Sequence, residues 1–143
     1  MGRKPEKTQQ NRIVKAPAPL AQVRGRKAEE RAAAWLATHG LKILARNVSC
    51  RGGELDLICL ESGTLVFVEV RLRTNSRFGG AIESITPAKR RRIIFAAKCW
   101  LIGDGQAYQN HPCRFDVVLF GNTAEPQWIR SAFDEEAFPA DAL

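Results

Sequence analysis

Two acidic residues, Asp56 and Glu69, lie in neighbouring apolar segments that have the composition of β-strands. The segments run from Glu54 to Leu60 and from Thr64 to Leu72, are rich in Val, Ile, Leu and Phe, and are separated by a Ser-Gly turn signal. A two-residue hairpin loop places Asp56 directly opposite Glu69. Like charges facing each other across strands repel, so this pair needs a compensating cation.

The same hairpin register places Glu54 opposite Arg71. Because side chains alternate along a strand, we expect these two residues and the Asp56–Glu69 pair on one face of the sheet. The apolar side chains expected on the other face are Leu55, Leu57, Val66, Val68 and Val70.

The natural cation for such a carboxylate pair is Mg²⁺ (or Mn²⁺), which takes one or two carboxylates and leaves room for water and a phosphate oxygen. A bound ion of this kind polarises a phosphodiester and lowers the pKa of a bound water. The alternative interpretation is a solvent-exposed strand face on which Glu54 and Asp56 form ordinary salt bridges with Arg71 and Arg73.

The net charge of +7 is unevenly distributed. Residues 1 to 27 contain eight Lys or Arg and one acid, so residues 28 to 143 are neutral overall. Within that neutral body, residues 71 to 98 contain eight basic residues against one acid, whereas residues 104 to 143 contain seven acids against two arginines. A basic block of this kind is typical of a surface that binds a polyanion such as nucleic acid. The alternative interpretation is that these charges only keep the surface solvated.

The order of elements predicts an α/β fold with a central mixed sheet, an antiparallel β-meander plus a further strand, flanked by helices. A helical pattern begins at Gly25 and ends at Gly40, and Thr86 with Pro87 starts a second helix that ends at Gly103. We expect strands at residues 41–47, 54–60, 64–72 and 114–120, a short edge strand at 127–130, and a mobile loop over 72–84. From the order of these elements and the distribution of charge, we expect a flexible basic arm over 1–24, one domain over 25–133 and an acidic tail over 134–143.

The four cysteines form no CxxC pair and the two histidines lie far apart, so a structural zinc site is not expected. The chain has no signal-peptide pattern and no long apolar span. We therefore expect a cytoplasmic protein with reduced cysteines and no membrane contact.

Several further motifs are spread over roughly Gly25 to Phe120. They are Gly25-x-x-Ala28-Glu29-x-x-Ala32, Arg51-Gly52-Gly53-Glu54-Leu55-Asp56-Leu57-Ile58, Val66-Phe67-Val68-Glu69-Val70-Arg71-Leu72-Arg73, Phe78-Gly79, Thr86-x-x-Lys89-Arg90 and Arg114-Phe115-Asp116-Val117-Val118. Together these motifs closely resemble the bacterial YraN (UPF0102) family, from which endonuclease activity is expected.

The family is similar in fold to archaeal Holliday-junction resolvases and type II restriction enzymes, so the resemblance implies a restriction-endonuclease-like fold. It implies Asp56 and Glu69 as metal ligands, Glu29 from the first helix as a further catalytic residue and Arg71 at a position usually held by lysine. Glu54 is an auxiliary candidate. The residues expected to contact nucleic acid, DNA in the first place, are Arg73, Arg77, Lys89, Arg90, Arg91 and Arg92.

Two departures from the family pattern are Arg71 in place of lysine and Ala28 in place of glycine. Arginine neutralises a phosphate but cannot deprotonate to act as a base.

Three functions are compatible with these residues. The first hypothesis is a Mg²⁺-dependent endonuclease acting on structured or branched DNA. The second is an inactive nucleic-acid-binding or accessory protein with the same fold, and the third is an interaction module that uses an exposed hairpin edge. A homodimer is expected only by analogy with resolvases.

Overall fold

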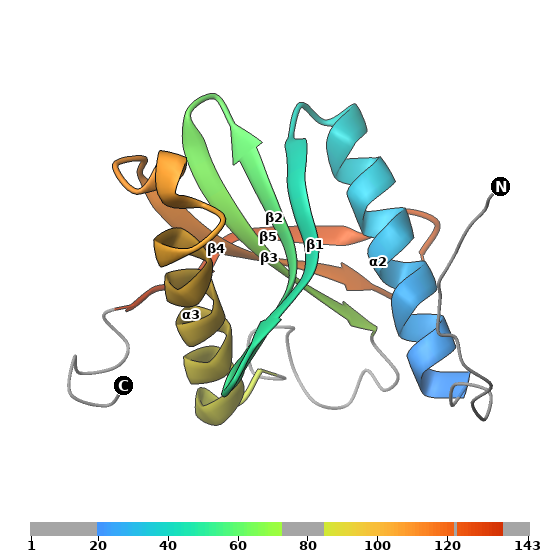
Figure 1. Cartoon of the computed structure of the whole chain (residues 1–143). Helices are drawn as coiled ribbons and strands as arrows, with labels where there is room; N and C mark the ends of the chain where they lie inside the picture. Colours follow the sequence, from blue (N-terminus) through green and yellow to red (C-terminus); the bar gives the residue numbers. More distant parts are fainter. Residues whose placement is uncertain (1–19, 73–84, 122, 136–143) are drawn as a thin grey trace, which may run out of the picture.

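Two helices cover opposite faces of a five-stranded sheet in this computed structural model (Figure 1). The structure describes residues 20–72, 85–121 and 123–135, with side chains from Arg26 onward. The helices and strands, in chain order, are α2 (Leu20–Thr38), β1 (Lys42–Cys50), β2 (Gly53–Glu61), β3 (Thr64–Leu72), α3 (Pro87–Ile102), the short 3₁₀ helix η3 (Gln106–Tyr108), β4 (Cys113–Phe120) and β5 (Gln127–Phe133).

The sheet order is β1-β2-β3-β4-β5, and only β3 and β4 are parallel. The antiparallel meander β1–β3 arises from short turns, whereas the crossover from β3 to the parallel strand β4 requires α3. The predicted α/β class with a mixed sheet and flanking helices is therefore confirmed. No helix among the described residues is long and apolar enough to cross a membrane.

The predicted hairpin register between β2 and β3 is confirmed from Glu61↔Thr64 to Leu57↔Val68. Its two-residue loop has positive φ at both positions, 49° at Ser62 and 85° at Gly63, which is the combination that a tight hairpin of this twist requires. The loop thus sets the register over the whole ladder.

Several predicted boundaries shift. Helix α2 begins at Leu20 rather than Gly25, β1 extends to Cys50, and β5 extends to Phe133. The start of helix α3 follows the prediction, because the Thr86 side chain accepts a hydrogen bond from the Lys89 backbone N–H and Pro87 opens the helix. The predicted mobile loop over 73–84, the arm over 1–19 and the tail over 136–143 lie outside the described residues.

The prediction that Leu55 shares a face with Leu57 is wrong. Leu57 packs in the core beneath α2, whereas Leu55 packs in the core beneath α3. The alternation is interrupted because the β1–β2 pair bends at this position, where Asn47 of β1 has φ 52°. Beyond the bend the pair turns toward α3 (Figure 1), and a Cβ on Gly53 would lie 2.7 Å from the Arg92 carbonyl oxygen. Glycine is therefore needed where the hairpin meets the helix.

Candidate metal and nucleic-acid site

Strand β2 separates from β3 at Asp56. The strand pairs described end at Leu57↔Val68, and at the next position the Asp56 carboxylate accepts a 2.8 Å hydrogen bond from the Val70 backbone N–H. The side chain therefore replaces a backbone partner at the point where the two strands diverge. This opening positions Asp56 and Glu69 at one end of the sheet.

Glu69 is an almost fully buried acid, with 3% of its surface exposed. Its Oε2 lies 3.7 Å from a guanidinium nitrogen of Arg71 and 3.8 Å from the Lys89 ammonium, whereas its buried Oε1 has no hydrogen-bond partner. Burial, followed by the charge of Asp56, raises the pKa of Glu69 to about 8 although both cations act to lower it. The carboxyl group is thus poised to hold a proton or a cation.

Helix α2 contributes Glu29 to the same cluster. The neighbouring Ala28 is buried against the sheet, and this small side chain lets the helix approach closely. Burial, the charge of Asp56 and a hydrogen bond with Asp56 raise the pKa of Glu29 to about 7. Its Oε1 is also buried without a hydrogen-bond partner.

These three acids line an open pocket of about 210 Å³ at the end of the sheet. The other lining residues are Ala28, Val70, Arg71 and Leu72. The charge of Asp56 raises the pKa of both glutamates, which favours their protonated forms when no cation is bound. The cluster is a group of hard oxygen donors from two strands and a helix, and the hairpin alone could not place the helix residue.

The donor chemistry fits a small divalent ion. Carboxylate oxygens are the ligands that Mg²⁺ and Mn²⁺ prefer, and the two buried oxygens without partners belong to this cluster. Within the described part of the chain, no three His, Cys, Asp or Glu side chains are already arranged as metal ligands. An ion of this kind keeps several waters and needs only one or two carboxylates.

Glu54 lies beside this cluster but not opposite Arg71 as predicted. It pairs with Ser49 of β1, and its carboxylate accepts a 2.9 Å hydrogen bond from the Lys89 ammonium. This contact holds the pKa of Glu54 below its usual value. The bend of the β1–β2 pair explains the difference, because it carries Glu54 toward α3 and away from β3.

Of the residues predicted to contact nucleic acid, two lie outside the described part of the chain and four lie on α3. Arg73 and Arg77 lie outside the described residues. Lys89 joins the acid cluster and Arg92 is exposed near the start of α3. Arg90 has a structural contact, because its Nε donates to the Ile85 carbonyl oxygen at 3.0 Å. The partly buried Arg91 follows it in the same helix.

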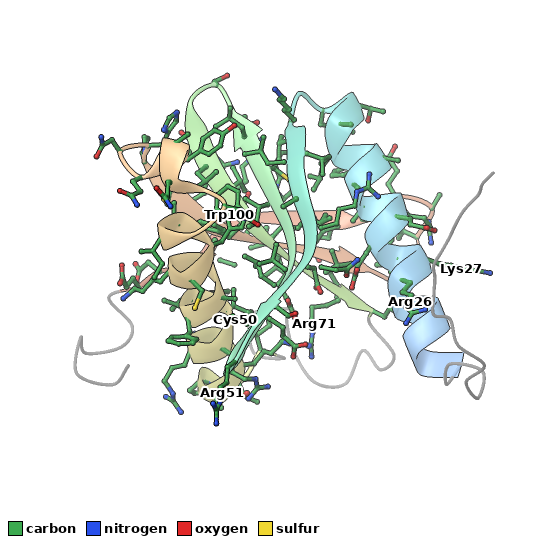
Figure 2. The ribbon with its side chains drawn as sticks, viewed as in Figure 1. Arg26, Lys27, Cys50, Arg51, Arg71 and Trp100 are labelled. Carbon is green, nitrogen blue, oxygen red and sulfur yellow. The ribbon has the colours of Figure 1, made fainter. Side chains whose placement is uncertain are left out.

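Two basic residues near the site were not predicted. Arg26 precedes Glu29 by three positions in α2 and acts to lower the pKa of that acid. Arg51 is exposed in the turn between β1 and β2. Figure 2 shows Arg26, Arg51 and Arg71 toward the same end of the molecule. The one-turn spacing in the helix could have indicated Arg26, but the position of Arg51 depends on the bend in the hairpin.

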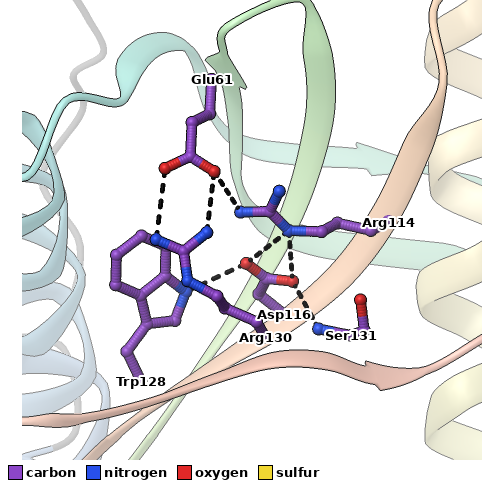
Figure 3. A network of polar contacts seen from close by, with 6 residues as sticks. All are labelled: Glu61, Arg114, Asp116, Trp128, Arg130 and Ser131. Carbon is purple, nitrogen blue, oxygen red and sulfur yellow. Dashed lines mark hydrogen bonds and ion pairs between the residues drawn. The ribbon is translucent and has the colours of Figure 1, made fainter.

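A second buried acid, Asp116 of β4, has very different surroundings (Figure 3). It is fully buried and accepts hydrogen bonds from Arg114 Nε at 3.0 and 3.1 Å, from Trp128 Nε1 at 3.0 Å and from the Ser131 backbone N–H at 2.9 Å. Ser131 has φ 50°, within a register shift between β4 and β5. Asp116 therefore fastens the bulged edge strand to the sheet.

Comparison with known proteins gives a consistent result over most of the chain. A family model described as "Uncharacterised protein family UPF0102" matches residues 28–120. The chain belongs to the UPF0102 family. A UPF0102 protein of Pseudomonas fluorescens is 46% identical over 114 residues, which cover 77% of this chain and 92% of the relative. A UPF0102 protein of Dechloromonas aromatica is 50% identical over 113 residues, which cover 79% of this chain and 90% of the relative.

The UPF0102 match includes the whole acid cluster and Lys89, and it ends before β5. The family resemblance predicted from the sequence motifs is therefore confirmed. The names of these relatives give the family and no reaction.

Proposed function

We propose that this UPF0102 protein is a metal-dependent endonuclease that hydrolyses phosphodiester bonds in structured or branched DNA, on a restriction-endonuclease-like fold. The observation that supports this most directly is the acid cluster of Glu29, Asp56 and Glu69 at an open pocket, with two buried oxygens lacking partners. Perturbed acids in a pocket are typical of functional sites. The preference for branched DNA rests on the resemblance to resolvases.

In this proposal Asp56 and Glu69 hold Mg²⁺ or Mn²⁺, which supplies charge stabilisation at the phosphate and a bound water of lowered pKa. Glu29, whose pKa is raised to about 7, can accept or release a proton near neutral pH and orient water beside Asp56. Arg71 provides positive charge for the phosphate but no neutral amine.

Basic residues on both helices and on the β1–β2 turn support a nucleic-acid substrate. Arg26 lies on α2, Arg51 on the turn, and Lys89 and Arg92 on α3, so cations come from segments on both sides of the acids. Phosphate contacts of this kind provide affinity and orientation without reading the sequence.

A second candidate function is nucleic-acid binding without cleavage, and the observation that favours it is Arg71 in the position of the expected lysine. If hydrolysis requires a neutral amine at that position, the protein binds DNA and leaves it intact. The two candidates differ in one measurable property, the appearance of cut product.

The test is to incubate purified protein with branched and linear DNA in Mg²⁺ or Mn²⁺, and to compare the wild type with Asp56→Asn. Asp104→Asn is a matched control, since this aspartate is exposed and does not line the pocket. We expect Asp56→Asn to reduce cleavage at least about 100-fold, which corresponds to roughly 2.7 kcal/mol of barrier. The control should cleave like the wild type.

Cleavage that survives Asp56→Asn would show that the activity comes from a contaminant. Salt-sensitive DNA binding without cleavage by the wild type would favour the second candidate. Arg71→Lys then tests the reason, because activity that appears only in this variant identifies the arginine as the defect.

A further inference from the structure

Lys89 of α3 forms ion pairs with acids of both β2 and β3 beside the pocket. Its ammonium lies 2.9 Å from Glu54 Oε1 and 3.8 Å from Glu69 Oε2, and 18% of its side chain is exposed. The first turn of α3 is fixed by the cap that Thr86 provides to the Lys89 backbone N–H. The backbone of Lys89 is therefore held in place while its amine reaches across to β2 and β3.

The two oxygens of Glu69 have different surroundings. Oε2 faces both Lys89 and Arg71, at 3.8 and 3.7 Å, whereas Oε1 is buried and without a hydrogen-bond partner. The cations consequently cluster at one oxygen of Glu69, and the other is left for the acid cluster. A phosphate that approaches this pocket meets negative charge from the acids, so it needs cations placed beside them.

We propose that Lys89 is the lysine of this site and contacts the phosphate of bound nucleic acid beside Glu69, although it comes from a helix and not from β3. An ammonium has three donors and a flexible stem, so Lys89 can keep its bond to Glu54 and direct another donor to a phosphate oxygen. Glu54 is then a positioning residue that holds the amine at the mouth of the pocket. This inference rests on the proposed function, because it assumes a nucleic-acid substrate.

The first test measures DNA binding by Lys89→Gln over a series of salt concentrations, with Ca²⁺, another hard cation with oxygen ligands, in place of Mg²⁺. Lys98→Gln is the matched control, since Lys98 is on the same helix and forms its ion pair with Glu135. A lost phosphate contact lowers the slope of log K against log salt by about one. We expect this decrease for Lys89→Gln, no change for the control and a wild-type slope for Lys89→Arg.

A wild-type slope in folded Lys89→Gln would overturn this inference and leave the proposed function intact. A wild type that shows no salt-dependent DNA binding would overturn the proposed function and this inference with it. A second measurement separates substrate contact from a merely structural role. Lys89→Gln should retain the increase in melting temperature that Mn²⁺ produces in the wild type, and loss of that increase would mean that Lys89 only holds the carboxylates.

Discussion

Asp116 and Glu69 are two buried acids at adjacent positions of neighbouring strands, and their surroundings are opposite. Asp116 pairs with Val68 of β3, and the next pair joins Glu69 to Val117 of β4. Both acids are almost inaccessible, with 0% and 3% of their surface exposed. Yet Asp116 accepts four hydrogen bonds, whereas Glu69 has one buried oxygen without any partner.

This difference separates an acid that builds the fold from one that is available for chemistry. A buried charge with a full set of donors stabilises a specific arrangement of strands, and removing it leaves those donors unsatisfied. A buried carboxyl group with a free oxygen and a raised pKa destabilises the protein unless a proton or cation binds it. The second situation persists where function requires it.

The comparison is tested most strongly by Asp116→Asn. This change removes the charge that Arg114 binds and places an amide among donors from Trp128 and Ser131. We expect the free energy of unfolding to fall by about 3–5 kcal/mol, as for other broken buried ion pairs. Denaturant titration measures this value.

Glu69→Gln is the matched substitution, and we expect it to change the stability of the metal-free protein much less at neutral pH. The pKa of about 8 keeps the Glu69 carboxyl group mostly protonated at this pH, and the amide of glutamine has a similar shape. Equal losses of stability in the two variants would contradict the distinction between these acids.

The next largest effect concerns the divalent ion. Mg²⁺ or Mn²⁺ at about 100 times its dissociation constant should stabilise the wild type by roughly 2.7 kcal/mol, because it binds only the folded state. The increase in melting temperature should disappear in Asp56→Asn and persist in Asp104→Asn. Thermal scans with and without the ion provide the measurement. Equal increases in melting temperature in all three proteins would contradict a metal site at Asp56.

A further effect is the dependence of stability on pH. Because the folded pKa of Glu69 is about 8, above the ordinary 4.5, the folded state binds the proton more tightly than the unfolded state. Stability should therefore decrease as the pH rises from about 4.5 to 8.

Glu69→Gln should flatten this decrease, leaving a weaker slope from the less buried Glu29, whose pKa is about 7. Melting temperatures of both proteins in metal-free buffers across this range provide the comparison. A wild type whose stability rises over the same interval would contradict the raised pKa.

Much of the local structure could be predicted from the sequence. The Ser62-Gly63 loop fixes the β2–β3 register, and Thr86 with Pro87 fixes the start of α3, because turn and cap preferences depend on a few neighbouring residues. The same local signals predicted that the ladder continues to an Asp56–Glu69 pair and a Glu54–Arg71 pair, whereas the described pairs end at Leu57↔Val68. These signals could not indicate the bend at Asn47, which reverses the face of Leu55.

By itself, then, the sequence determined the order of the elements and which strands bear the acids. The family resemblance already named Glu29 and Lys89, but only the tertiary structure decided how they meet the acids of the hairpin. Lys89 reaches Glu54 across 35 positions of the chain, and Glu29 reaches Asp56 from a different helix. Whether a buried acid keeps its charge or shares a proton depends on every donor around it, and those donors come together only when the sheet and both helices pack.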